Sequence, residues 1–204
     1  MLNWIKNHFN TLCHLQLNTV VTDKQGATIS LDDGFLRYIQ CVKSIRPANN
    51  KLMVIGNGGS AGIASHMAID YSKNGRLHAM TFTDASAVTC LSNDYGYEHV
   101  FSKQIEYHGR KGDVLIAISS SGRSQNILNA VAAARNIGCQ VVTFSGFEAK
   151  NPLSLQGDIN FYVASQEYGF VEVAHLSLGH AMLDYIIQQE CQTKNQPHVA
   201  LATN

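Results

Sequence analysis

The fold is decided by residues 112–124, which read Gly-Asp-Val-Leu-Ile-Ala-Ile-Ser-Ser-Ser-Gly-Arg-Ser. An apolar run that ends in serines and a glycine predicts a strand that is buried on both faces and followed by a polar loop. Residues 124–137 have the pattern of a helix, so the loop leads directly into one. A strand, a loop of small residues and a helix in this order are typical of a parallel α/β sheet.

Similar units lie on both sides of this stretch. Further short apolar runs cover residues 51–55, 78–82, 139–144 and, more weakly, 160–163. Helical segments are predicted between and after them, near residues 61–73, 85–92, 98–108 and 170–190. Strands that alternate with helices predict a doubly wound α/β domain, in which helices cover both faces of a parallel sheet.

Two helices are predicted ahead of the sheet, within residues 1–46. Ile5, Phe9 and Leu12 fall on one face of the first helix. Ser30 is predicted to cap the second helix, in which Phe35 belongs to a similar apolar stripe. We expect one domain over residues 1–192, with this helical pair included, and a loosely ordered tail over residues 193–204.

The composition excludes several classes of protein. The chain has 204 residues, of which 45% are hydrophobic, and its 15 basic and 15 acidic side chains cancel. A chain without net charge has no general attraction to nucleic-acid phosphates or anionic lipid, so we expect neither as a partner. No apolar run approaches the roughly 18 residues that span a bilayer and no signal peptide is evident, so a cytoplasmic protein is expected. Five scattered cysteines argue against a disulfide framework.

Two loops are candidates for a ligand site, because ligands of open α/β sheets bind beyond the carboxyl ends of the strands. Each is rich in small polar residues and runs into a helix, whose N-terminus attracts anions. The serines suit a phosphate group, although they could instead only cap the two helices. The candidate substrate-binding residues in these loops are Asn57, Gly58, Gly59 and Ser60 in the first, and Ser119, Ser120, Ser121 and Ser124 in the second.

Ionisable residues are concentrated on two of the predicted helices. His66 and Asp70 are four residues apart and therefore lie one above the other. Glu172 and His180 lie two turns apart on the last long helix. These are the ligand types of a zinc site and the acid and base types of proton transfer, although a single helical histidine is more often structural. Asp94, in a polar stretch, could hold sugar hydroxyls or belong to a turn.

The chain resembles the phosphoheptose isomerases, which are sugar isomerase (SIS) domain proteins. The resemblance covers nearly the whole chain, and it rests on Gly56-Asn-Gly-Gly-Ser60, His66, Asn93-Asp-Tyr-Gly-Tyr97, residues 112–124, Ala132-Ala-Ala-Arg135 and the helix with His175 and His180. It implies a three-layer α/β/α sandwich with a five-stranded parallel sheet and a homotetramer joined by the N-terminal helices. It also implies conversion of sedoheptulose 7-phosphate to a heptose 7-phosphate for bacterial surface polysaccharide, such as lipopolysaccharide.

The resemblance also implies roles for individual residues. Phosphate contacts fall on the four positions Ser60, Ser119, Ser121 and Ser124. The catalytic bases fall on Asp70, where the family has glutamate, and on His180. Zinc would bind these two together with His66 and with Glu172, where the family has glutamine.

Two functions remain open on the sequence alone. An aldose-ketose isomerase needs a positioned base and a partner that moves the hydroxyl proton, and Asp70 and His180 would supply them. The alternative is a non-catalytic SIS protein that binds a sugar phosphate or the bacterial replication initiator. The complete set of acid and base residues favours the enzyme.

Overall fold

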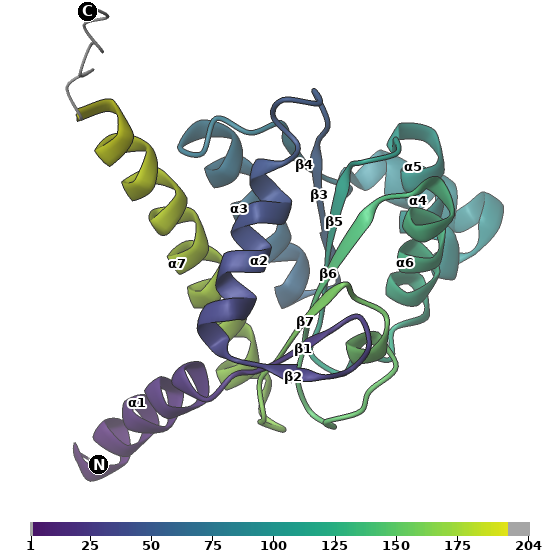
Figure 1. The fold of residues 1–204 in the computed structure, drawn as a ribbon. Helices are drawn as coiled ribbons and strands as arrows, with labels where there is room; N and C mark the ends of the chain where they lie inside the picture. The colour runs from purple at the N-terminus through teal and green to yellow at the C-terminus, as the bar shows by residue number, and fades with distance from the viewer. Residues whose placement is uncertain (1, 196–204) are drawn as a thin grey trace, which may run out of the picture.

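The computed structural model describes residues 2–195, which form three layers with a sheet in the middle (Figure 1). The sheet has seven strands in the order β2-β1-β7-β6-β5-β3-β4. Five of them match the predicted strands and run parallel to their neighbours among the five. Their bounds are β3 (Leu52–Gly56), β4 (Ala79–Thr81), β5 (Val114–Ser119), β6 (Gln140–Ser145) and β7 (Ile159–Tyr162).

The prediction of a five-stranded, all-parallel sheet is wrong, because a hairpin extends the sheet at β7. Its strands are β1 (Val20–Asp23), which pairs antiparallel with β7, and β2 (Thr28–Ile29). The Asp23 carboxylate accepts hydrogen bonds from the amides of Gln25 and Ala27, and Gly26 supplies a positive φ of 79°. The β-branched run before this turn favours a strand over a helix. Residues 1–46 are therefore not simply two helices.

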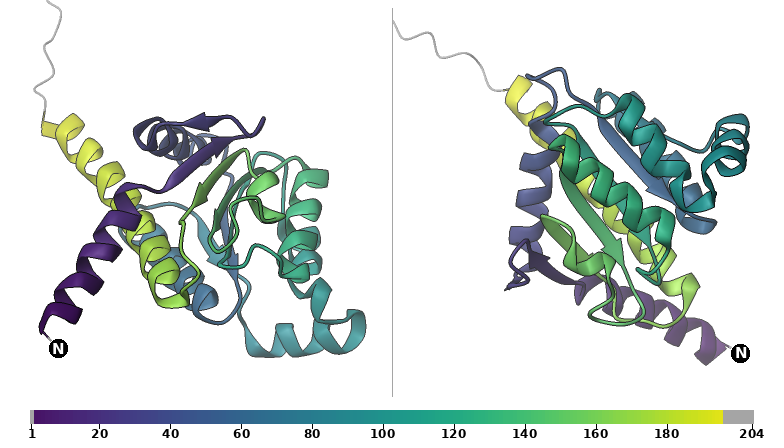
Figure 2. Two further views of the ribbon diagram at one scale, coloured as in Figure 1. Left: turned by 90° about the horizontal axis from the view of Figure 1, so that it is seen from below. Right: turned by 90° about the vertical axis from the view of Figure 1, so that its right-hand side faces the viewer.

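The helices divide between the two faces of the sheet. On one face lie α2 (Leu31–Lys43), α3 (Gly59–Lys73) and α7 (Tyr168–Asn195), and on the other α4 (Ala85–Tyr95), α5 (Val100–His108) and α6 (Gln125–Ile137). The long α1 (Leu2–Leu17) leans on α7 and projects beyond the sheet (Figure 2). Two 3₁₀ helices, η1 (Tyr97–His99) and η2 (Leu153–Leu155), complete the described chain.

The core consists of two apolar layers, one on each side of the sheet. In β3, Val54 packs toward α2, α3 and α7, whereas Ile55 packs toward α4, α5 and α6. Every residue of β5 is buried, as expected for an inner strand of a sheet that is covered on both faces. This burial fixes the strand ends, and with them the loops that form the site.

The ends of the chain and its helix caps agree with the sequence only in part. Ser30 caps α2 as predicted, since its hydroxyl accepts a hydrogen bond from the Asp33 amide at 3.0 Å. The tail predicted over residues 193–204 lies, from residue 196 on, outside the described residues. No helix within residues 2–195 has the length and apolar character needed to cross a membrane.

Candidate functional site

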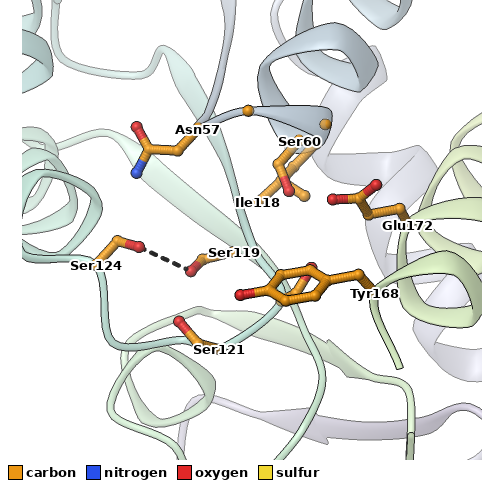
Figure 3. Close-up of a pocket in the computed structure, with 11 residues that line it drawn as sticks. Asn57, Ser60, Ile118, Ser119, Ser121, Ser124, Tyr168 and Glu172 are labelled. Carbon is orange, nitrogen blue, oxygen red and sulfur yellow. Dashed lines mark hydrogen bonds between the residues drawn. The ribbon is translucent and has the colours of Figure 1, made fainter. Parts of the chain in front are cut away.

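The main candidate site lies beyond the ends of the neighbouring strands β3 and β5, whose following helices cover opposite faces of the sheet. After β3 the chain enters α3 on one face of the sheet, and after β5 it enters α6 on the opposite face. The two loops therefore diverge and leave a pocket between them, at the usual place for a ligand in an open α/β sheet. The pocket encloses about 240 Å³ and is lined by Asn57, Gly58, Gly59, Ser60, Ile118, Ser119, Ser120, Ser121, Ser124, Tyr168 and Glu172 (Figure 3).

Glycine is required at one position of the second loop. Gly122 has a φ of 61°, a conformation that residues with a side chain rarely adopt. A methyl group there would also overlap the side-chain amide of Asn151, which is fully buried and bonded to Ser145, Gly146 and Glu148. Gly122 thus lets the second loop, residues 119–124 (the serine loop), lie directly on the buried Asn151.

The serine hydroxyls are not used to cap the helices. The N-cap residue of α3 is Gly58, which has no side chain, and Ser124 at the N-cap of α6 makes no capping hydrogen bond. The Ser119 hydroxyl donates weakly to that of Ser124 at 3.5 Å and accepts from the Gly122 amide. The hydroxyls of these loops therefore remain available to a ligand, which argues against a purely capping role.

Three polar residues that were not predicted as site residues, Tyr97, Asn126 and Tyr168, belong to this region. Asn57 and Asn126 exchange two amide hydrogen bonds of 2.9 Å, and the Tyr97 hydroxyl donates to the Asn57 oxygen at 3.1 Å. These bonds tie the first loop to α6 and η1. Tyr168, at the start of α7, lines the mouth of the pocket. Tyr97 stands in the motif over residues 93–97, but the contacts of all three residues depend on tertiary packing, which local sequence does not reveal.

Glu172 lines the pocket between the two loops (the serine pocket) and does not lie with the histidines. A methyl group on Gly59 would overlap both carboxylate oxygens of Glu172, so the carboxylate lies directly against the first turn of α3. Figure 3 shows it pointing from α7 toward this turn. None of the lining residues is basic, and nearby Arg123 forms an ion pair with Glu148.

A second group of candidate residues lies further along the same two helices. Asp70 Oδ2 is 3.2 Å from His66 Nε2 and 3.7 Å from His180 Nδ1. One potential ligand atom from each of these residues lies within 4.8 Å of the others. The structure brings together three of the four predicted metal ligands, and Glu172 is not among them. Two nitrogen donors and one oxygen donor fit zinc, with a fourth position open as in catalytic sites.

Two other residues lie away from both groups. Asp94 is exposed on α4, where its carboxylate accepts a hydrogen bond from the Asn93 amide, and it does not line the pocket. His175 is fully buried, and its Nε2 donates to the Ser145 carbonyl at 3.0 Å. Burial lowers the pKa of His175 to about 4, although this hydrogen bond acts in the opposite direction. His175 is thus a neutral core residue.

Comparison with known proteins identifies the family. The SIS domain model matches residues 36–146. The phosphoheptose isomerase of Paramagnetospirillum magneticum is 37% identical over 74% of this chain and 82% of its own length. That of Colwellia psychrerythraea is 31% identical over 91% and 95%. The solved phosphoheptose isomerase of Neisseria gonorrhoeae superposes with a TM-score of 0.77 at 30% identity, over 90% of this chain and 98% of its own. The chain therefore belongs to the phosphoheptose isomerases of the SIS domain family.

Proposed function

We propose that this enzyme interconverts the ketose and aldose forms of a sugar phosphate, with sedoheptulose 7-phosphate as the leading substrate. The observation that carries the proposal is the pairing of two sites along α3 and α7. A pocket lined by serine hydroxyls that do not cap a helix lies at the start of both helices. A group of one aspartate and two histidines lies further along them. The product would be a heptose 7-phosphate for surface polysaccharide.

The serine pocket would hold the phosphate. Ser60, Ser119, Ser121 and Ser124 offer neutral hydrogen-bond donors around the N-terminus of α3. The first amides of a helix lack partners within the helix, and the helix dipole favours an anion at that end. Together these donors can bind a phosphate without a basic residue. Asn57, Gly58, Gly59 and Ser120 would complete the walls.

The distance between the two sites supports an elongated substrate. Glu172 and His180 are eight residues apart on α7, which corresponds to about 12 Å along the helix axis. A ligand with its phosphate among the serines must extend in this direction to reach Asp70 and His180. An open-chain sugar phosphate has that shape.

Asp70 and His180 would carry the proton transfers. Isomerisation removes a proton from the carbon beside the carbonyl, protonates the carbonyl oxygen to give an enediol, and returns a proton to the neighbouring carbon. Asp70, whose carboxylate lies close to both His66 and His180, would act as base at carbon. His180 would move the proton between the two oxygens.

A zinc ion on His66, Asp70 and His180 is part of the proposal. When bound, zinc would polarise the substrate carbonyl. His66 would serve chiefly as a ligand, and its Nε2, 3.2 Å from Asp70 Oδ2, would also help to orient that carboxylate.

A homotetramer is proposed as the active assembly. The α1 helix exposes Trp4 at 67% and Phe9 at 62%, which is a large apolar surface for a helix that leans on the sheet domain. Burial between subunits would remove this surface from water.

The experiment is an isomerase assay with sedoheptulose 7-phosphate and purified protein. Aldose formation is expected with the parent chain, and Asp70→Asn should lower kcat by about 100-fold or more because the base at carbon is lost. Ser121→Ala should raise KM more than it lowers kcat. A parent chain that binds the sugar phosphate and produces no aldose would show a binding protein instead.

A further inference from the structure

The serine pocket has an unusual charge for a phosphate site. Among the residues that line it, Glu172 is the only acidic or basic side chain. Arg123, the basic residue of the serine loop, forms an ion pair with Glu148 on the exposed surface. A phosphate monoester carries a charge of about −1.5 to −2 at neutral pH. The pocket thus combines donors that attract an anion with a carboxylate that repels one.

The position of Glu172 makes this conflict direct. Its carboxylate lies against Gly59, the first residue of α3, and α3 has no side-chain cap. A negative group is stabilised at this end of a helix. Glu172 therefore occupies the place where the helix would stabilise a bound phosphate. A phosphate that lies against Gly59 would meet this carboxylate and be repelled by it.

We infer that Glu172 sets the selectivity of the pocket, by competing with phosphate for the start of α3. A compact anion such as inorganic phosphate must displace the carboxylate and gains only the serine contacts. A sugar phosphate also brings hydroxyl groups, which can donate hydrogen bonds to the displaced carboxylate. Glu172 would thus reject free phosphate while it still accepts a phosphate attached to a polyhydroxylated chain. This inference rests on the proposed phosphate role of the serines.

The test compares the affinities of two probes, inorganic phosphate and sedoheptulose 7-phosphate, by isothermal titration calorimetry. In Glu172→Gln, which preserves size and removes the charge, inorganic phosphate should bind at least 10-fold more tightly than to the parent. The affinity for the sugar phosphate should change by less than about threefold. Glu167→Gln is the matched control, because it removes the same charge from an exposed residue near the start of α7 that does not line the pocket. It should leave both affinities unchanged.

The outcomes separate this inference from the proposed function. The inference would be overturned if Glu172→Gln bound inorganic phosphate no more tightly than the parent. It would also be overturned if Glu167→Gln raised the affinity for inorganic phosphate as much as Glu172→Gln does. Ser121→Ala tests the pocket itself, and it should weaken phosphate binding in the Glu172→Gln background. If it does so while Glu172→Gln leaves affinity unchanged, only the inference fails. If Ser121→Ala and Ser124→Ala both leave phosphate binding unchanged, the serine pocket is not the phosphate site and the proposed function fails with it.

Discussion

Gly122→Ala should destabilise the protein and weaken ligand binding together. Gly122 has a φ of 61°, and a Cβ atom on it would lie 2.9 Å from the Asn151 Cβ and overlap the amide beyond. Because Asn151 is fully buried, its side chain has no free space into which it can move. Either the serine loop must shift outward or Asn151 must give up its hydrogen bonds.

The size of the effect follows from two contributions. A left-handed backbone costs a residue with a side chain about 1–2 kcal/mol. The Asn151 amide donates to Ser145 Oγ, to the Gly146 carbonyl and to the Glu148 carbonyl, and its oxygen accepts from the Ser154 amide. Loss of two such bonds costs about 2 kcal/mol. The free energy of unfolding should therefore fall by about 3–4 kcal/mol, which corresponds to a Tm lower by about 10 °C.

The assay is urea unfolding followed by circular dichroism, together with calorimetric titration of sedoheptulose 7-phosphate. Gly62→Ala is the control, since Gly62 lies in α3 with nothing within 4 Å of its added Cβ. It should stabilise the helix by up to about 1 kcal/mol. If Gly122→Ala unfolds within 1 kcal/mol of the parent and binds the sugar phosphate equally well, the loop does not depend on this glycine.

Three further predictions concern pH, metal and assembly. His175 is neutral in the folded protein because burial lowers its pKa to about 4, so the unfolded chain binds more protons between about pH 6.5 and pH 4. Stability should fall by about 3 kcal/mol as the pH drops through this range, and chemical unfolding of His175→Gln should show a shallower fall. Elemental analysis after zinc is supplied should find stoichiometric metal in the parent and none in His180→Ala; a metal-free parent would leave proton transfer to the side chains alone. Sedimentation should give a tetramer, and a monomer at micromolar concentration would contradict the proposed role of α1.

The parallel strands were predictable because each is a short apolar run bounded by polar loops. Burial on both faces makes such strands conspicuous in a sequence, and all five were located to within about two residues. The hairpin of β1 and β2 was missed for the opposite reason. It is short and lies at the sheet edge, and its β-branched run before the turn at Gly26 covers only residues 19–22. Its pairing with β7 is a contact between distant parts of the chain, which no local pattern reveals.

The candidate site was predictable where the residues follow a strand directly. The order β3, loop, α3 and β5, loop, α6 is enough to bring Ser60 and Ser119 to one edge of the sheet. Residues that reach the pocket from elsewhere were not predictable. Tyr97 depends on the position of η1, and Tyr168 on the point at which α7 begins. The polar surroundings of Asp94 suggest a contact with sugar hydroxyls or a turn; in the structure it is exposed on α4 and does not line the pocket.

The separation of Glu172 from the histidines has a simple geometric cause. The helices α3 and α7 both start at the carboxyl edge of the parallel strands and run side by side, with α7 beginning about one turn before α3. Glu172 is in the second turn of α7 and meets Gly59, whereas Met67 packs against Gly179 further along.

Helical spacing in the sequence shows that Glu172 and His180 share a face of α7. It does not show which residues of α3 lie opposite each of them. The alignment of α7 along α3 depends on where α7 begins, which the loop after β7 determines. The result is one interface between two helices, with the proposed anion site at its start and the proposed proton-transfer site two turns further on. This interface favours an extended substrate over a compact one.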